Sequence, residues 1–256
     1  MFRPCTWLLL LTASACADRA TGDSATAETS ADSAMSGQAE AALAVTLFDG
    51  AGAARALPAT AAEMAQYVAT KARSLTPAGC ATSTSTATSA TVVFDHCTGS
   101  HGLVTIDGTL QAQITSVTPS SVAFRITADQ LMVGGAALDV AITGTYGSTG
   151  GTQTLAVSST TLGTGALGNA VTHDGDYTAS WTATCATVDG TWSTSIGERD
   201  RGLAVSLTRC TAACPSGSVT RTVGTKTISL TFDGSPTATW SASTGRSGQL
   251  SLGCAR

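Results

Sequence analysis

Seven consecutive residues carry the densest set of groups in this chain that could do chemistry: Asp95, His96, Cys97, Thr98, Gly99, Ser100 and His101. A carboxylate, two imidazoles and a hydroxyl this close together could bind a metal ion or transfer a proton. However, residues adjacent on a strand point to opposite faces, and Gly99 and Gly102 are typical of a turn. We therefore favour a turn beside a disulfide of Cys97, with a metal or proton-transfer site as the alternative.

A second imidazole, His173, stands beside Asp174 and close to Asp176. Asp174 precedes a glycine, and within the region of expected strands the same Asp-Gly pair recurs three more times, beginning at Asp107, Asp189 and Asp233. Asp-Gly suits a type I′ hairpin turn, because both central residues of that turn need a positive φ. We therefore interpret the four pairs as hairpin turns and place His173 on a solvated loop.

The chain lacks the short motifs that mark common enzymes: it has no G-x-S-x-G elbow, H-E-x-x-H zinc helix, phosphate-binding loop or G-x-G-x-x-G fingerprint. Its acids are sparse and fall mostly in expected turns, which gives little support to paired carboxylates for glycoside chemistry. We expect a protein that is not an enzyme, with no catalytic residue, bound metal or cofactor. The less favoured alternative is a hydrolase that uses His96, His101 or His173 with a nearby aspartate.

Three aromatic residues, Tyr177, Trp181 and Trp240, share the parity of their aliphatic neighbours along the chain. That register favours packing in a core, and a sugar-stacking platform on an exposed face is the alternative. The densest run of charge, residues 197–202 (GERDRG), is typical of a solvated hairpin tip.

The eight cysteines divide into two groups. Cys5 and Cys16 lie at the N-terminus, and six others follow: Cys80, Cys97, Cys185, Cys210, Cys214 and Cys254. An even number in an exported chain predicts three disulfides. We expect the pairs Cys80–Cys97, Cys185–Cys210 and Cys214–Cys254. The competing interpretation is a metal site made by Cys210, Cys214 and a histidine.

Residues 1–15 read as a secretory signal, with a positive charge at Arg3 and an apolar run too short to span a bilayer. The tripeptide Ala13-Ser14-Ala15 before Cys16 resembles a bacterial lipobox. The resemblance implies that Cys16 is acylated with fatty-acid chains such as palmitate and becomes the mature N-terminus. Ordinary signal-peptidase cleavage that leaves Cys16 unmodified is the alternative.

Residues 16–40 are small, polar and acidic, so they cannot offset the entropy of ordering and predict a disordered tether. Ala17 directly after Cys16 resembles the pattern that is sorted to an outer membrane. The chain is therefore expected to be an exported lipoprotein whose partner is a membrane, through its lipid. Much of the net charge of −4 lies in the tether, so residues 41–256 are nearly neutral, offer no basic stripe and exclude nucleic acid as a partner.

Two helices are expected at the start of the folded part. Residues 39–48 are rich in helix formers, and Thr60 with Glu63 has capping-box spacing ahead of apolar residues at helical intervals. Strands follow, each with apolar residues at every second position, for example Ile228, Leu230 and Phe232. We count about eleven strands, all antiparallel.

These elements predict one α+β domain over residues 41–256 that is mainly β: a large antiparallel meander whose apolar face is covered by short N-terminal helices. A sheet of that size cannot leave its apolar face in water, so a half-barrel or a sandwich-like fold is expected. The segment 94–110 (FDHCTGSHGLVTIDGTL) resembles the start of the sheet in exported bacterial β-rich proteins of unknown function.

Together these features favour a non-enzymatic cell-envelope lipoprotein with a binding or structural role. The alternative is a carrier of acyl chains or other hydrophobic cargo. Its half-barrel plugged by helices would be similar in architecture to the lipoprotein carriers that hold acyl chains.

Overall fold

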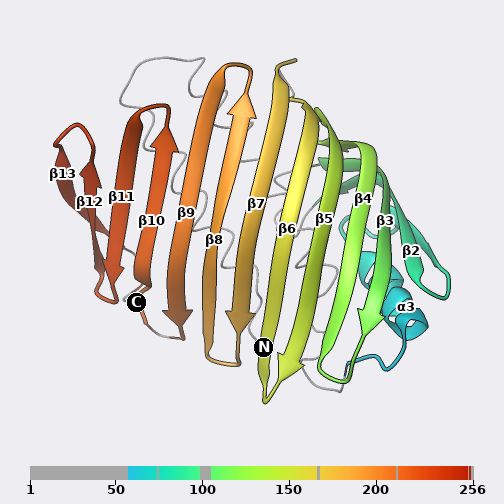
Figure 1. Cartoon of the computed structure of the whole chain (residues 1–256). Helices are drawn as coiled ribbons and strands as arrows, with labels where there is room; N and C mark the ends of the chain where they lie inside the picture. Colours follow the sequence, from blue (N-terminus) through green and yellow to red (C-terminus); the bar gives the residue numbers. More distant parts are fainter. Residues whose placement is uncertain are drawn as a thin grey trace.

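The computed structural model describes residues 57–73, 75–98, 105–165, 168–211, 213–252 and 254. Thirteen strands form one open sheet in which spatial order follows chain order from β1 to β13 (Figure 1). Every neighbouring pair is antiparallel. The predicted antiparallel meander is confirmed: the described strands form a single curved sheet rather than a sandwich of two sheets.

The described part of the chain begins with one helix, α3 (Ala61–Ala72), and continues with strands of five to fourteen residues. The strands are β1 (Ala81–Ser85), β2 (Ser89–Thr98), β3 (Thr105–Val117), β4 (Ser121–Val133), β5 (Ala136–Thr149), β6 (Thr152–Thr164), β7 (Ala170–Trp181), β8 (Cys185–Ile196), β9 (Arg199–Cys210), β10 (Ser216–Val223), β11 (Lys226–Asp233), β12 (Thr237–Ala242) and β13 (Ser247–Ser251). The expected count of about eleven was too low because β1 and β10 carry little apolar alternation.

The two faces of the sheet differ as the period-two spacing predicts. One face, here the apolar face, carries buried side chains such as Leu138, Ile142, Tyr177, Leu207 and Phe232. The other, here the hydroxyl face, carries exposed Ser and Thr, among them Ser158, Thr178, Thr191, Ser206, Thr231 and Thr239. This division identifies the side of the sheet that meets solvent.

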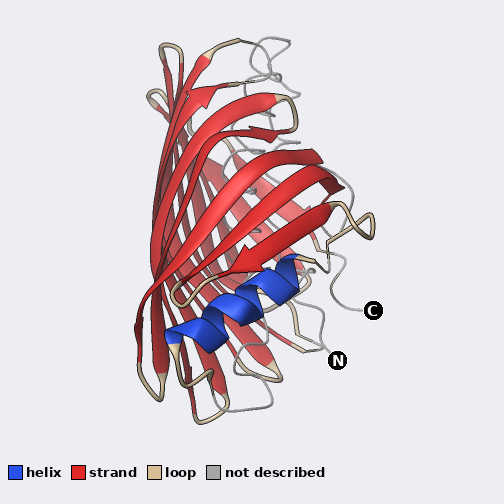
Figure 2. Cartoon of the chain, turned by 90° about the vertical axis from the view of Figure 1, so that its right-hand side faces the viewer, coloured by secondary structure: helices blue, strands red, loops and turns tan. Residues whose placement is uncertain are grey.

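Helix α3 begins at the capping box that the sequence predicts. Thr60 accepts a hydrogen bond from the Glu63 amide, and the Glu63 carboxylate accepts one from the Thr60 amide. The helix buries Met64 and Val68 against β1, β2 and β3, where the sheet curls around it (Figure 2). It covers only this end of the apolar face, and the other expected helix, residues 39–48, lies outside the described residues. None of the described helical structure is long and apolar enough to cross a membrane.

All three disulfides join the predicted pairs, Cys80–Cys97, Cys185–Cys210 and Cys214–Cys254. Cys185 lies directly opposite Cys210 on neighbouring strands β8 and β9. The alternative metal site at Cys210 and Cys214 is wrong, because both sulfurs are consumed in disulfides.

The interpretation of Asp-Gly as hairpin chemistry is wrong for three of the four pairs. Only Asp233-Gly234 lies at a turn, whereas the glycines after Asp107, Asp174 and Asp189 lie inside β3, β7 and β8. A Cβ on Gly175 would lie 2.6 Å from Cδ1 of Trp192, and one on Gly190 would lie 2.4 Å from Cβ of Tyr177. Each of these two glycines is directly opposite that aromatic residue, so glycine leaves room for a ring from the neighbouring strand.

Candidate functional site

The first candidate site lies at a β-bulge in β2. The pairing of β2 with β3 shifts between Phe94 and Cys97, and both of these side chains are buried. The two residues between them, Asp95 and His96, are exposed, and His96 has a positive φ of 53°. A bulge of this kind re-aims side chains and bends its strand. It therefore places two neighbouring polar side chains outside the core.

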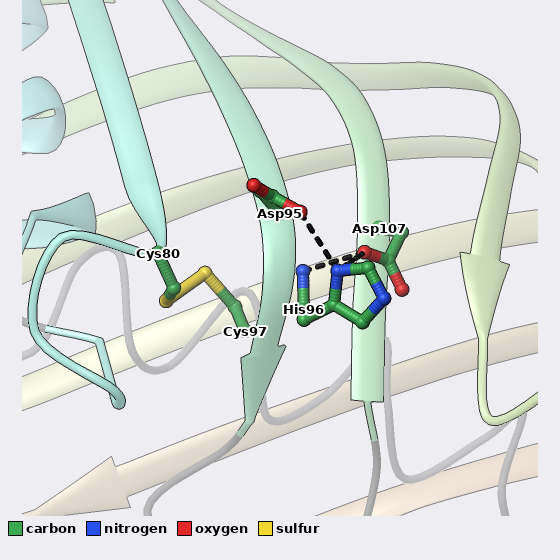
Figure 3. Close-up of polar contacts among 5 residues, drawn as sticks. All are labelled: Cys80, Asp95, His96, Cys97 and Asp107. Atoms are coloured by element: carbon green, nitrogen blue, oxygen red, sulfur yellow. Dashed lines mark hydrogen bonds and ion pairs between the residues drawn. A yellow bond between two sulfur atoms is a disulfide. The ribbon is translucent and has the colours of Figure 1, made fainter.

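Asp107 of β3 completes the group, as Figure 3 shows. Nδ1 of His96 lies 2.7 Å from Oδ1 of Asp95 and 3.2 Å from Oδ1 of Asp107. The backbone N–H of His96 also donates to Oδ1 of Asp107, at 2.5 Å. One carboxylate oxygen therefore faces both the backbone and the ring of His96.

The surroundings of His96 favour its charged form. The hydrogen bond to Asp95, followed by the negative charges of Asp107 and Asp95, raises the pKa of His96 above its usual 6.5. The His96 side chain is 81% exposed and that of Asp95 is 85% exposed, so water screens these interactions. The group is a solvated imidazole between two carboxylates rather than a buried catalytic dyad.

The three ligand atoms could also hold a metal ion, since all of them lie within 4.8 Å of one another. Bonds of about 2.1 Å to a tetrahedral zinc ion would place its ligands about 3.4 Å apart, close to the spacing at His96. Cys97 is not available as a ligand because it is bonded to Cys80, and Thr98 donates to the Thr76 carbonyl. Ser100 and His101 lie outside the described residues.

A second bulge in β4 has the same construction without an imidazole. The pairing of β4 with β5 shifts between Ala128 and Leu131, and Gln130 has a positive φ of 51°. The backbone N–H of Gln130 donates to Oδ1 of Asp139 at 2.8 Å, and its side-chain amide donates to the same oxygen at 3.1 Å. Asp139 thus does for Gln130 what Asp107 does for His96. We conclude that the main role of Asp107 is to stabilise the positive φ of His96 by accepting a hydrogen bond from its backbone N–H.

The two bulges are neighbours across β3. The pairing of β3 with β4 shifts between Asp107 and Gln111, and Gly108 lies next to the second bulge. A Cβ on Gly108 would be 3.5 Å from Cδ1 of Leu131. Aligned bulges bend adjacent strands together, and two of the strands in this line of irregular pairing, β2 and β3, pack against α3.

No protein-family model matches this chain. No curated protein and no solved structure matches it either. The function therefore has to be inferred from the residues of the chain itself.

The structure places His173 inside strand β7 on the apolar face, so its assignment to a solvated loop is wrong. Its side chain is 2% exposed, and Nδ1 lies 2.7 Å from the Thr194 hydroxyl. Burial lowers the pKa of His173 to about 4, against a smaller opposing effect of the Asp174 charge. Asp174 itself faces solvent and accepts a hydrogen bond from Thr160 at 2.9 Å.

The described histidines are not brought together. His96 is exposed on β2, whereas His173 is buried on β7, five strands further along the sheet. Each has different partners, two carboxylates for His96 and a hydroxyl for His173. They therefore do not share a cleft in which a general acid and base could act together.

A row of buried polar residues crosses the apolar face at His173. Thr161, His173, Thr194 and Arg201 lie opposite one another on β6, β7, β8 and β9, and all are buried. Arg201 shows that the charged run at residues 197–202 is not entirely a solvated tip. Sequence parity could have revealed His173, since it shares the parity of Val171 and Tyr177 on the same strand.

The aromatic residues lie on the apolar face. Tyr177 is buried and stacks on Trp192 with ring centroids 5.5 Å apart, and Trp181 lies 6.2 Å from Tyr146. The core interpretation is confirmed for Tyr177, and the half-buried Trp181 and Trp240 share its face. The sugar-stacking alternative fails because it needs these rings on the exposed face.

The hydroxyl face carries an open trough of about 880 Å³ across β3 to β8. Small residues line it, including Ala123, Gly144 and Ala156, and three charged residues also reach it: Arg125, Asp176 and Asp189. The Asp189 carboxylate accepts a hydrogen bond from the Ser206 hydroxyl at 2.6 Å. The trough is shallow and open to solvent, so it does not enclose an acyl chain.

Proposed function

We propose that this protein is a non-enzymatic module of the cell envelope, with a binding or structural role, held at a membrane by lipid on Cys16. The observation that carries the proposal is the hydroxyl face, a broad Ser/Thr surface on a rigid sheet with an open trough at its centre. Such a surface offers many hydrogen-bonding groups and few charges. It fits contact with a polar partner rather than chemistry on a small substrate.

The three disulfides support the export part of the proposal. Bonds of this kind form and persist in oxidising compartments outside the cytosol. They agree with the secretory signal at residues 1–15 and with the lipobox-like residues before Cys16. The acidic segment 16–40 would then separate the sheet from the outer membrane surface.

The carrier alternative has less support in the described residues. A carrier needs an enclosed apolar cavity. The apolar face of β2 to β7 is instead filled by packed side chains such as Leu110, Phe124 and Ile142, with α3 over β1 to β3. The trough lies on the other face and is open to solvent.

The hydrolase alternative also has less support. It requires an acid and a base that converge on one substrate atom. His96 faces two carboxylates in solvent, and His173 faces a hydroxyl in the core. The Thr194 hydroxyl beside His173 is buried with it, and neither residue lines the trough.

The anchor is tested by expressing the full chain in a bacterium with an outer membrane and determining the intact mass of the mature product. We expect an N-terminus at Cys16 that carries acyl chains, and recovery in the outer-membrane fraction. Cys16→Ala should move the protein to the soluble exported fraction, because a protein without acyl chains loses its stable attachment.

Cys5→Ala is the matched control, because Cys5 leaves with the signal and its loss should change neither mass nor location. An unmodified mature N-terminus, or a Cys16→Ala variant that stays on the membrane, would contradict the proposal.

A further inference from the structure

The two edges of the sheet are built differently. Beside β1, the Thr86 amide donates to the Ser89 carbonyl and the Asp95 amide donates to the Cys80 carbonyl. The even-numbered residues of β1 therefore make the backbone hydrogen bonds to β2. Antiparallel pairing alternates, so Ala81, Ser83 and Ser85 direct their backbone groups away from β2. The outward edge of β1 is therefore centred on Ser83.

Helix α3 closes that edge at its centre. Nη2 of Arg73 donates to the Ser83 carbonyl at 2.8 Å, and Nε of Arg73 donates to the Ser83 hydroxyl at 2.9 Å. The same hydroxyl donates to the Ala69 carbonyl at 2.6 Å. A strand from another molecule cannot pair with β1 without displacing these bonds.

The other edge, β13, has no such cover among the described residues (Figure 1). The Ala242 amide donates to the Arg246 carbonyl, and the Leu252 amide donates to the Pro236 carbonyl, so even-numbered residues pair with β12. The outward groups therefore belong to Ser247, Gln249 and Ser251, all of which are exposed. These outward groups are centred on Gln249, as those of β1 are centred on Ser83, but no described element covers them.

Features that normally protect an edge strand are mostly missing from β13. Proteins block such edges with charged side chains, prolines or bulges, or with a covering element. The segment Ser247–Ser251 has no charge and no proline, and its pairing with β12 is regular. Leu250 is 45% exposed on the apolar face of this strand. The protective feature that β13 does have is its short length of five residues.

We propose that β13 pairs antiparallel with β13 of a second copy of this chain, about a two-fold axis at Gln249. In this register Gln249 and the partner's Gln249 exchange both backbone hydrogen bonds, and Ser247 does the same with the partner's Ser251. A closed two-fold contact of this kind is the commonest symmetry of homo-oligomers. The proposal does not depend on the lipid anchor.

The side chains of β13 fit this pairing better than they fit a charged partner. On the hydroxyl face, Ser would meet Ser and Gln would meet Gln, and both pairs can share hydrogen bonds. On the apolar face, the exposed Leu250 would lie opposite the partner's Gly248. The Trp240 ring already covers Gly248, where a Cβ would lie 2.7 Å from Nε1, so the leucine would gain an aromatic neighbour.

A second copy is also favoured over a head-to-tail chain of molecules. That arrangement would need β1 of the next copy, whose central residue is bonded to Arg73. The two-fold pairing uses the open edge of both molecules and closes the assembly at two.

The test is sedimentation equilibrium of the full exported chain over a wide concentration range, in a Cys16→Ala background that removes association through lipid. We expect a reversible monomer–dimer equilibrium. Gln249→Pro should weaken it at least tenfold, because it removes an outward N–H and leaves the bonds of Gly248 and Leu250 to β12 in place. Proline is tolerated on an edge strand where its missing N–H would face solvent.

Ser85→Pro makes the same change on the closed edge and should leave the dimer unaltered. Gln249→Lys and Gln249→Glu test the register, because each places like charges opposite each other at the two-fold axis. Each should be monomeric alone, and an equal mixture should recover a heterodimer whose affinity falls with salt. This arm stays informative if the proline variant misfolds.

A Cys16→Ala parent chain that stays monomeric at its highest soluble concentration would overturn the proposal and leave this edge to a strand of another protein. A Gln249→Pro variant that dimerises like this parent would also overturn it, as would charge variants that show no recovery on mixing.

Discussion

The two halves of the sheet are stabilised in different ways. From β1 to β7 the apolar face forms one continuous core with side chains such as Phe124 and Leu155, and α3 covers its curled end. From β9 to β12 a smaller cluster holds only Val205, Leu207, Phe232 and Ala238 as buried members. The first half contains one disulfide, Cys80–Cys97, whereas the second half contains Cys214–Cys254 and shares Cys185–Cys210 with β8. The second half therefore has at least as many covalent links as the first, although its described core is thinner.

The difference shows how curvature and burial go together. Two bulges, clamped by Asp107 and Asp139, bend β2 to β5 so that the apolar face closes on itself and on a helix. The strands of the second half have regular pairing and no described helix over them. A regular sheet buries less of its own surface, and disulfides compensate by restricting the unfolded chain.

The largest expected effect comes from removing the disulfide of the second half. The pair Cys214→Ala and Cys254→Ala opens a loop of 40 residues, which costs about 4 kcal/mol in the chain-entropy model. We expect hydrogen exchange to accelerate first in β10 to β13, because few buried contacts remain there. Chemical unfolding followed by amide exchange measures both effects.

The matched control is the pair Cys80→Ala and Cys97→Ala, with a separation of 17 residues and an expected cost of about 3 kcal/mol. Its strands should keep their protection, because the core and α3 hold them. Equal loss of protection in β1 to β3 would break the comparison of the two halves.

The layout of the sheet could be predicted from sequence because one face is apolar and the other carries Ser and Thr. Alternation at Leu138 and Ile142, or at Ile228 and Phe232, needs no knowledge of the neighbouring strands. The capping box at Thr60 is equally local. The strands β1 and β10 were missed because their burial depends on neighbours rather than on their own pattern.

The candidate site was harder to predict because it depends on backbone geometry. Nothing in the residue types of His96 or Gln130 announces a positive φ. A usable signal is the break in parity: Phe94 and Cys97 are both buried three positions apart, as are Ala128 and Leu131. Such a break in parity indicates a bulge. An Asp-Gly pair inside a strand is less informative, because a strand can contain glycine to make room for an aromatic ring or to allow curvature of the backbone.

The free energy of unfolding should fall in acid because of His173, which lies on β7 at the boundary between the two halves. Its pKa is about 4 in the folded protein against 6.5 in a free chain, so the unfolded state binds the proton more tightly. Stability is therefore complete above pH 6.5, falls as the pH drops from 6.5 to 4, and changes no further below that. The loss from this group is roughly 3 kcal/mol.

Urea unfolding at several pH values checks this prediction. His173→Gln keeps a hydrogen-bonding group near Thr194 without a titrating ring, and should remove most of the decline between pH 6.5 and 4. The groups opposite or near His173 on the neighbouring strands are Thr161, Thr194 and Arg201, with Asp174 beside it. A decline that persists unchanged in the variant would assign the acid sensitivity to other groups.

The smallest effects separate the two bulges within the first half. Asp107→Ala and Asp139→Ala should each cost about 1 kcal/mol, because each leaves a backbone N–H to water alone. His96→Gln should change the stability less than either aspartate variant, because Gln130 shows that glutamine suits a clamped left-handed position. The raised pKa of His96 should return towards 6.5 in Asp95→Asn and Asp107→Asn, as NMR titration of the ring can show.

A zinc-dependent rise in Tm of the wild type, but not of His96→Gln, would contradict a purely structural role for this bulge and make it a metal site.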